Sequence, residues 1–367
     1  MAVSSNTVRV ALMPGDGIGT EVTNACLAVL EPLARRHGLG LRFDTLRAGA
    51  MAYRDTGSAM DEDTFKSAAT ADAILLGAMG WPGIRYPDGT EIAPQLDLRF
   101  RLGLYAGVRP IRTLPGVPPV LADPRAAQID LVILRESTEG LFAARGRGEV
   151  IDDREARDTM VITRATTERL SDFAFDLARR RAEQQGRRGL VTLVDKANVF
   201  TGFAFMRKVF HEVARRHPDV EAAHHYIDAM ALDMIRRPWD FDVLPTENMF
   251  GDILSDLGAG LIGGMGFAPS ADIGEHHAVF QPSHGTAPDI AGKGLANPTA
   301  MLLSAAMMLE WLAGRGAGAG WAEAAAELQA AVDAAFAAGL RTPDIKGDAG
   351  TSDAVKAVIE HLGFTPR

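Results

Sequence analysis

The sequence predicts an α/β protein in which a parallel sheet carries helices on both faces. Short apolar runs such as VRVALM (8–13), DAILLGAMG (72–80) and IDLVILRES (129–137) alternate with helical patterns along the chain. This alternation is typical of parallel sheets, because two parallel strands need a crossover connection, usually a helix. With 367 residues, of which 47% are hydrophobic, the chain is long enough for two domains or one large α/β unit.

Each element follows from its local pattern. In chain order, strands are predicted at 8–13, 39–48, 72–80, 129–137, 190–199, 221–228 and 241–248, and helices at 21–36, 61–71, 166–185 and 203–216. The strands are short apolar runs, and the helices space their apolar residues by three and four. From residue 297 onwards the chain is rich in alanine and strongly helical. The stretch AGRGAGAGWAEAAAE (313–327) is interpreted as one loop between two helices.

The composition argues against several classes of protein. A net charge of −9 argues against a nucleic-acid partner, because neutralising phosphates requires clustered lysine and arginine. The single cysteine, Cys26, excludes an intrachain disulfide, and its helical position predicts an inert, half-buried thiol. We see no secretion signal and no apolar stretch long enough to span a bilayer. We therefore expect a cytoplasmic protein without a membrane segment.

The N-terminal stretch MPGDGIGTEV raises the question of a dinucleotide-binding Rossmann fold. That fingerprint has the spacing G-x-G-x-x-G and an acidic residue about 20 positions later. Here Gly15, Gly17 and Gly19 follow the spacing G-x-G-x-G, Thr20 stands where the third glycine belongs, and no acid ends the second strand at the required distance. We therefore expect a tight strand-to-helix turn, with Glu21 in the first turn of the helix.

Acidic residues form the first candidate site. Asp252 and Asp256 are four residues apart, so on a helix they share one face. Two carboxylates placed in this way repel each other unless a cation or a base lies between them, and oxygen ligands suit Mg²⁺ or Mn²⁺. The alternative is an exposed helix with aspartates favoured near its N-terminus. A third acid, Asp228, follows a strand pattern and opens a helical one.

Basic residues form a second candidate group. Lys196 follows a strand in VDKANV, where the active sites of α/β proteins lie. It is a candidate general base if its neighbours favour the neutral amine, and otherwise a solvated lysine. Arg99, Arg109 and Arg135 suit a substrate with more than one carboxylate, because a guanidinium group binds carboxylates through two hydrogen bonds. Surface salt bridges are the alternative role for these arginines.

A long loop forms the third candidate. The run HGTAPDIAGKGLANP (284–298) consists of loop-forming residues. Its glycines, threonine, asparagine and backbone amides could wrap a nucleotide. Composition alone does not indicate which nucleotide it would be.

Together these segments resemble the β-decarboxylating dehydrogenases of (2R)-hydroxy acids, the isocitrate/isopropylmalate dehydrogenase family. The resemblance covers nearly the whole chain, and its most specific segments are VDKANV, NMFGDILSDL and HGTAPDIAGKGLANP. It implies an isopropylmalate dehydrogenase-like fold, distinct from Rossmann, with two α/β domains and the active site in the cleft between them. Residues 1–104 and 263–367 would form a nucleotide-binding domain, and residues 105–262 a central domain for substrate, metal and dimerisation.

The resemblance also implies a role for each candidate. The substrate is a small hydroxy-dicarboxylate, whose carboxylates Arg99, Arg109 and Arg135 would bind. Asp252 and Asp256 would hold Mg²⁺ or Mn²⁺. Asp228, as a further metal ligand, and Lys196, which assists proton removal from the C2 hydroxyl, would come from the partner subunit of a homodimer. The residues implied at the cofactor are Ile18, His284, Gly285, Thr286, Ala287, Pro288, Asp289, Ile290 and Asn297.

One departure from the family concerns protonation. The family has a tyrosine seven residues after the third arginine, which protonates the enolate formed by decarboxylation. Here that position is Phe142, which has no proton to give. We expect either that protonation passes to water or another acid, or that the physiological reaction stops at oxidation.

Other departures concern the substrate. Isocitrate enzymes have a serine where this chain has Ala93, which disfavours isocitrate. Isopropylmalate enzymes have two leucines where this chain has Gln95 and Leu96, and a glutamate where it has Ile92. Gln281 stands where a glutamate usually precedes the HG loop. We rank 3-isopropylmalate first, with a tartrate, D-malate or other malate-type dehydrogenase as the alternative. An impaired member that acts as a metal- or nucleotide-binding regulator is the alternative from a different class.

The cofactor follows from the pair Asp289 and Ile290. NADP-dependent isocitrate enzymes of the family carry a lysine and a tyrosine at these positions. A carboxylate accepts hydrogen bonds from ribose hydroxyls and repels a 2′-phosphate, so we predict NAD⁺.

The double substitution Asp289→Lys and Ile290→Tyr should shift the ratio of kcat/KM values towards NADP⁺ by about tenfold or more. The reason is that the 2′-phosphate of NADP⁺ would then meet a lysine that pairs with it, where the wild type has a carboxylate that repels it. Steady-state kinetics with both cofactors would measure the shift. An unchanged ratio would undo the assignment.

Overall fold

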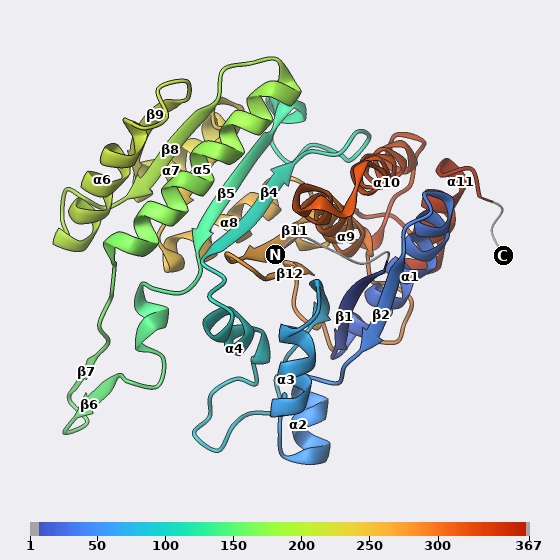
Figure 1. Cartoon of the computed structure of the whole chain (residues 1–367), viewed down its shortest axis with the longest axis horizontal. Coiled ribbons are helices and arrows are strands. Elements are labelled where there is room, and N and C mark those ends of the chain that lie inside the picture. The colour runs from blue at the N-terminus through green and yellow to red at the C-terminus, as the bar shows by residue number, and fades with distance from the viewer. Residues whose placement is uncertain (1–6, 365–367) are drawn as a thin grey trace. The chain divides into compact units, whose positions relative to one another are not determined.

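The computed structural model describes residues 7–364, and the chain divides into two compact units. Unit 1 comprises Met1–Gly103, Leu114–Pro118 and Ile262–Arg367, and unit 2 comprises Leu104–Thr113 and Pro119–Leu261. In both units helices pack on strands, which confirms the predicted α/β class (Figure 1). No helix within residues 7–364 is both long and apolar enough to cross a membrane.

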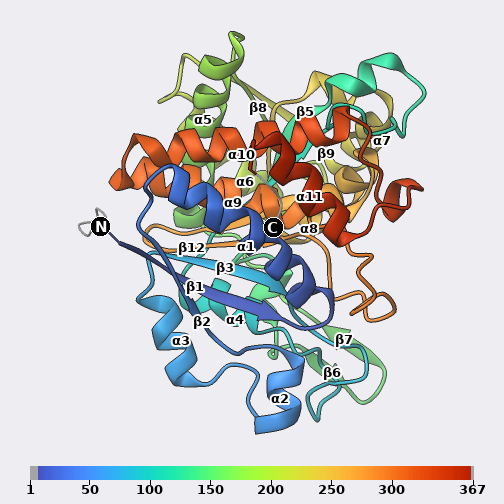
Figure 2. The same cartoon turned by 90° about the vertical axis from the view of Figure 1, so that its right-hand side faces the viewer.

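Unit 1 is built on strands in the order β2-β1-β3-β12-β11. Their bounds are β1 (Val8–Gly15), β2 (Leu41–Thr45), β3 (Ala73–Ala78), β11 (Pro269–Ile273) and β12 (Ala278–Pro282). The helices are α1 (Ile18–Arg36), α2 (Ala50–Thr56), α3 (Glu62–Ala69), α4 (Pro94–Arg101), α9 (Thr299–Leu312), α10 (Ala319–Ala337) and α11 (Thr351–His361). Figure 2 shows α1, α9, α10 and α11 on one side of these strands and α2 and α3 on the other.

Unit 2 is built on strands in the order β4-β5-β10-β8-β9. Their bounds are β4 (Ala106–Arg112), β5 (Asp130–Glu136), β8 (Leu190–Asp195), β9 (Glu221–Tyr226) and β10 (Val243–Thr246). The helices are α5 (Arg164–Gln185), α6 (Thr201–Ala214), α7 (Ile227–Arg236) and α8 (Asn248–Leu261). A separate hairpin pairs β6 (Glu149–Ile151) with β7 (Glu155–Arg157). Helices α5 and α6 pack together, as do α7 and α8.

The expectation of a purely parallel sheet is wrong at two places. Strands β4 and β5 are antiparallel, and so are β11 and β12. Residues 113–129 connect the first pair without an α-helix, and a four-residue turn, in which Gly274 N donates to His277 O over 2.8 Å, connects the second. Antiparallel neighbours need only short connections, whereas parallel ones need a crossover.

The expectation of a loop over 313–327 is also wrong. One irregular helical turn, Ala313–Ala317, follows α9, and α10 already begins at Ala319. Trp321, Ala324 and Leu328 are buried at helical spacing, so packing of this face stabilises the Ala-rich segment as a helix.

Helix α1 buries its apolar face as its pattern predicts. Val22, Cys26, Val29 and Leu33 are all fully buried, at intervals of three and four residues. Cys26 is therefore buried more deeply than expected, and burial raises the pKa of its thiol to about 12. A thiol that keeps its proton in this way is a poor nucleophile.

The turn between β1 and α1 owes its glycines to close backbone contacts. Gly17 has a φ of 55°, and a Cβ atom there would lie 2.2 Å from the carbonyl oxygen of Thr286. The next residue, Ile18, donates its N–H to that same oxygen over 2.9 Å. The glycine motif therefore brings this turn against the loop that contains Thr286.

Asp16 in the same turn joins three segments of unit 1. Its buried carboxylate accepts hydrogen bonds from the backbone N–H groups of Ala50 (2.6 Å), Met51 (2.9 Å) and Gly80 (2.9 Å). Hydrogen bonds to a charged acceptor are about twice as strong as neutral ones. Asp16 thus fixes the start of α2 and the end of β3 against the β1–α1 turn.

Candidate functional site

The two predicted metal-binding acids lie on the exposed face of α8. Its buried face contains Gly251, Leu254, Ser255 and Gly258, so Asp252 and Asp256, one turn apart, point outwards, and the Asp252 side chain is 51% exposed. Partial burial and, next, the negative charge of Asp252 raise the pKa of Asp256. Two like charges held one turn apart favour any cation that binds between them.

Glycines on α8 set its distance from the strands below it. A Cβ atom at Gly251 would lie 2.7 Å from Cβ of Arg135 on β5, and one at Gly258 would lie 2.8 Å from Cδ1 of Ile111 on β4. These contacts are shorter than side chains allow, so only glycine fits. The close approach puts the acids of α8 beside the arginines of β4 and β5.

Arg109 and Arg135 lie on neighbouring strands and are both buried. In the β4–β5 register Arg109 pairs with Ile133, two residues before Arg135, so the two arginines share one face of the sheet. Arg135 donates through Nε to Oδ1 of Asn248 (2.9 Å) and through Nη1 to Asp252. The positive charges of Arg135 and Arg109 also act on Asp256, opposing the rise in its pKa. The structure therefore brings four predicted site residues together.

Phe142 contacts this cluster. The Arg135 guanidinium carbon lies 5.0 Å from the centroid of the Phe142 ring, a cation–π distance. The residue that replaces the family's tyrosine therefore packs against one of the predicted substrate-binding arginines.

Lys196 and Asp228 form a second pair in unit 2. Lys196 follows β8, and Asp228 lies in the first turn of α7 after the neighbouring strand β9. The Lys196 Nζ donates to Oδ1 of Asp228 over 2.5 Å, and this hydrogen bond lowers the pKa of the Asp228 carboxyl. Within residues 7–364 no three His, Cys, Asp or Glu side chains come together as a metal-binding group, so one chain does not bring Asp228 to Asp252 and Asp256.

In unit 1, α4 carries three predicted substrate residues on one face. Gln95, Leu96 and Arg99 are spaced by three and four residues. Arg99 is buried and donates through Nε to Oδ2 of Asp272 over 2.9 Å, and the Gln281 amide donates to the same oxygen over 3.0 Å. A glutamate at 281 would lack that donor, so glutamine suits this buried carboxylate.

Two apolar residues named in the sequence analysis are buried. Ile92, which stands where isopropylmalate enzymes have a glutamate, is fully buried in a small core cluster with Ala50 and Ala59. Ile18, at the start of α1, is 5% exposed. Its contact with the cofactor stays a prediction.

The loop predicted to bind the nucleotide begins beside the β1–α1 turn. His284 has a buried Nε2 atom without a hydrogen-bond partner, and burial lowers the pKa of its ring. Asp289 is exposed and Ile290 half-buried. Gly285 and Thr286 lead into a turn formed by Ala287, Pro288, Asp289 and Ile290, in which Ile290 N donates to Ala287 O over 3.1 Å. An unpartnered polar atom and an exposed carboxylate fit a polar ligand such as an adenosine group.

Asn297, at the far end of this loop, has structural partners. Its Nδ2 donates to Oδ2 of Asp344 over 3.0 Å, and its Oδ1 accepts from Thr299 N over 3.0 Å. The amide oxygen therefore holds the start of α9, and the amide nitrogen ties it to the turn that contains Asp344.

Sequence reasoning did not single out two buried acids that shape the site of unit 2. Glu136, directly after Arg135, accepts hydrogen bonds from Thr138 N (2.7 Å), Thr138 Oγ1 (2.6 Å) and Glu139 N (2.7 Å), while burial raises its pKa to about 7. Glu247 accepts from two backbone N–H groups at the start of α8. The available signal was their position, Glu136 as the last residue of β5 and Glu247 directly after β10.

Comparison with known proteins gives one consistent family. The family model described as isocitrate/isopropylmalate dehydrogenase matches residues 9–358. A 3-isopropylmalate/3-methylmalate dehydrogenase of Methanocaldococcus jannaschii is 41% identical over 96% of this chain and 98% of its own. A 3-isopropylmalate dehydrogenase of Thermotoga maritima is 41% identical over 93% and 94%. The crystal structure of isocitrate dehydrogenase from Methylococcus capsulatus matches with a TM-score of 0.82 at 36% identity, covering 97% of this chain and 99% of that one.

The raised pKa of Asp256 predicts how a divalent cation binds. Asp256 keeps its proton to a higher pH than an ordinary aspartate, and a protonated carboxyl does not coordinate a cation. Mn²⁺ affinity measured by titration calorimetry should therefore fall about twofold or more between about pH 7.5 and about pH 5. The weaker binding left in Asp256→Asn should change less with pH. A wild-type affinity that does not fall towards acid pH would contradict this prediction.

Proposed function

Because the chain belongs to the isocitrate/isopropylmalate dehydrogenase family, we propose that it oxidises a 3-substituted (2R)-malate with NAD⁺ and a divalent cation. The family assignment makes it an oxidoreductase that acts on a small hydroxy acid with decarboxylation, in a family that uses NAD(P) and divalent metals. The choice of NAD⁺, the metal site, the substrate and the homodimer are our proposals.

The observation that carries the proposal is the cluster of Arg109, Arg135, Asp252 and Asp256. Two buried guanidinium groups beside two outward carboxylates form a site for a molecule that has both carboxylates and a chelating hydroxyl. A divalent cation held by the aspartates would act as a Lewis acid on the C2 oxygen, and NAD⁺ would accept the hydride. The arginines would hold the substrate carboxylates in place through this chemistry.

Lys196 is proposed to accept the proton of the C2 hydroxyl at its Nζ atom. In the structure the Lys196 Nζ donates to Oδ1 of Asp228 over 2.5 Å. A lysine accepts a proton only as the neutral amine.

The proposed substrate is 3-isopropylmalate. Gln95 and Leu96 lie on the same face of α4 as Arg99, and Leu96 supplies apolar surface for a branched 3-substituent. Gln95 makes that surface half polar, which favours a tartrate- or D-malate-type substrate as the second candidate. A methylene group is worth about 1–3 kcal/mol of discrimination, so we expect activity on several malates.

NAD⁺ is proposed because Asp289 is exposed at the tight turn of the loop. An exposed carboxylate can accept hydrogen bonds from the ribose hydroxyls of adenosine, and it would repel a 2′-phosphate.

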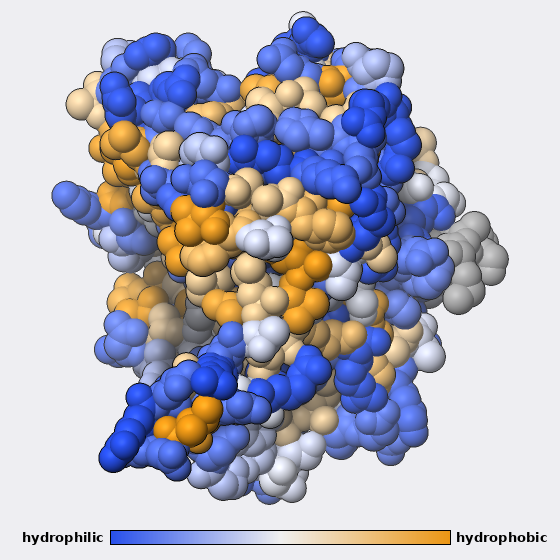
Figure 3. All heavy atoms as spheres, turned by 90° about the vertical axis from the view of Figure 1, so that its left-hand side faces the viewer, coloured by the Kyte–Doolittle hydropathy of each residue, from blue (hydrophilic) through white to orange (hydrophobic). Residues whose placement is uncertain are grey.

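A homodimer is proposed from the apolar surface of unit 2. Leu232 and Ile235 on α7 and Met249 and Ile253 on α8 are exposed hydrophobic residues, with Ile253 61% exposed. Figure 3 views the side that carries α6 and shows hydrophobic side chains gathered on it. Helices that expose this much apolar surface are typical of an interface.

The alternative of a regulator without catalysis requires a degraded site. Instead the arginine–aspartate cluster and the Lys196–Asp228 pair are both formed.

We expect NAD⁺ reduction with a panel of (2R)-malates to be fastest with 3-isopropylmalate and to require Mn²⁺ or Mg²⁺. The panel would include 3-methylmalate, D-malate, tartrate and isocitrate, each assayed with and without chelator. Absence of turnover on every malate would refute the proposed dehydrogenase activity. A preference for tartrate or D-malate would refute 3-isopropylmalate as the substrate.

Phe142 predicts that chemistry after hydride transfer is slow. In a single turnover we expect NADH to appear before the decarboxylated keto acid, and Phe142→Tyr to speed the later step by about tenfold or more, because it restores an acid. Rapid quench with separate detection of NADH and of the protonated, decarboxylated keto acid would measure both. Phe142→Leu is the matched control, and equal rates for NADH and the keto acid in the wild type would contradict the prediction.

A shared active site predicts that two inactive variants rescue each other. Lys196→Met and Asp252→Asn should each be inactive, yet a refolded equal mixture should recover about a quarter of wild-type activity, because half of the dimers then hold one intact site. The matched control mixes Lys196→Met with Asp228→Asn, which lie in the same half-site and should stay inactive. Equal recovery of activity in both mixtures, or no recovery in the first mixture, would argue against an active site shared between subunits.

A further inference from the structure

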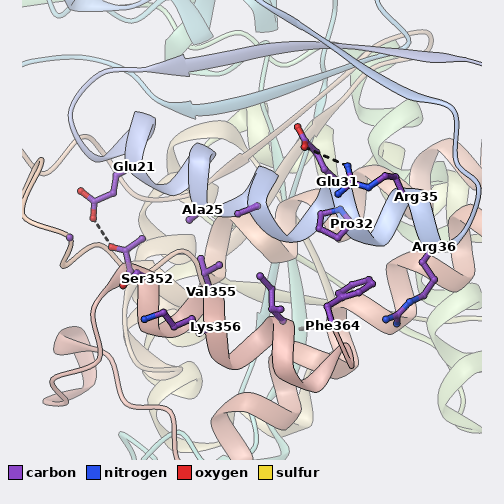
Figure 4. A pocket seen from close by; sticks show the side chains of 14 residues that line it. Glu21, Ala25, Glu31, Pro32, Arg35, Arg36, Ser352, Val355, Lys356 and Phe364 are labelled. Atoms are coloured by element: carbon purple, nitrogen blue, oxygen red, sulfur yellow. Dashed lines mark hydrogen bonds and ion pairs between the residues drawn. The ribbon is translucent and has the colours of Figure 1, made fainter. Parts of the chain in front are cut away.

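A groove of about 990 Å³ lies in unit 1 between α1 and α11 (Figure 4). Its volume is at the upper end of the range typical of small-molecule sites. The residue Phe364, just beyond α11, closes one end. None of the residues assigned above to substrate, metal or cofactor lines it.

The walls of the groove are apolar. From α1 come Ala25, Ala28 and Pro32, and from α11 come Val355 and Ile359. Figure 4 shows Val355 directed towards Ala25, and Phe364 directed towards Pro32. The two helices therefore leave an apolar space that side chains do not fill, in contrast to the dense packing of protein interiors.

The rim of the groove carries charges of both signs, and Arg36 is already paired with Glu327. Three basic residues and two acidic ones line it: Arg35, Arg36, Lys356, Glu21 and Glu31. Lys356 and Arg35 form exposed ion pairs, of 3.8 Å to Asp353 and 3.9 Å to Glu31, which contribute little to stability. Their charged groups can therefore turn to an anion at small cost.

One end of the groove connects to the loop proposed to bind NAD⁺. Thr351, the first residue of α11, donates its N–H to Gly294 O (2.8 Å), and its Oγ1 bonds to Ala296 O (2.6 Å) and to Glu21 (2.5 Å). Glu21 also accepts from Ala296 N over 3.2 Å. These bonds tie the start of α11 and the first turn of α1 to residues that follow the loop's tight turn.

We propose that this groove binds a small amphipathic carboxylate, and that a ligand there weakens binding at the nucleotide loop. The apolar walls would take the hydrocarbon body, and Lys356 or Arg35 the carboxylate. A body seated between α1 and α11 strains the Thr351 bonds, because the same helices hold both. The second part rests on the proposed NAD⁺ site, whereas the first part does not.

Binding is tested with sodium octanoate and 4-phenylbutyrate by titration calorimetry on the full-length protein. Ala28→Phe fills the groove, and Asn24→Phe, an exposed position on α1 outside the groove, is its control. Lys356→Gln removes a rim charge, and Lys66→Gln, which has a similar exposed pair at 3.9 Å, is its control. We expect affinity to fall about fivefold or more in Ala28→Phe and about threefold in Lys356→Gln, with both controls unchanged.

Equal affinities in all variants, or no binding of either probe to the wild type at about 10 mM, would overturn the site. The coupling is tested by NADH fluorescence titration: octanoate should raise the Kd of NADH about fivefold in the wild type and not in Ala28→Phe. An unchanged Kd would overturn the coupling. A wild type that binds octanoate in the groove and no NADH would instead refute the proposed cofactor.

Discussion

The close approach of α8 to strands β4 and β5 is the constraint on which the proposed active site depends. Gly251 and Gly258 allow it, since a Cβ atom at either position would lie under 3 Å from a strand side chain. At that distance the carboxylate of Asp252 reaches the guanidinium group of Arg135, although 117 residues separate them in sequence. Side chains in place of these glycines would push α8 away from the strands, and with it the carboxylate of Asp252 away from Arg135.

Unit 1 uses the same physical device at its proposed nucleotide loop. Gly17 lets the β1–α1 turn touch the backbone of Thr286, and Asp16 in that turn binds three backbone N–H groups from other segments. Glycines in this position resemble a phosphate-binding loop, yet the space beside them is filled by protein. Backbone approach, rather than ligand access, explains why they are glycine.

The strand and helix ranges predicted from local patterns each correspond to an element of the structure, and the roles proposed for the candidate residues stay predictions. The spacing of Asp252 and Asp256 predicted that they share one helix face, and the apolar run before Lys196 predicted that this lysine follows a strand. Both predictions were possible because they depend only on neighbours in the sequence. Patterns did not predict what depends on distant contacts. The antiparallel β4–β5 pair, the buried bond from Arg99 to Asp272 and the burial of Ile92 all arise from tertiary packing. The first turns of α10, residues 319–327, were assigned to the preceding loop because their helical stability comes from the face they bury.

The bond between Arg135 and Asp252 has a thermodynamic consequence. In the unliganded chain each of these groups is the other's counter-ion, so the electrostatic field of the site is already neutralised from within. A cation that takes Asp252 releases Arg135, and a carboxylate that takes Arg135 releases Asp252. On the proposed chemistry, the first ligand to arrive bears the cost of breaking the internal pair and the second does not. By reciprocity of linkage, metal and substrate would then each raise the other's affinity by the same factor.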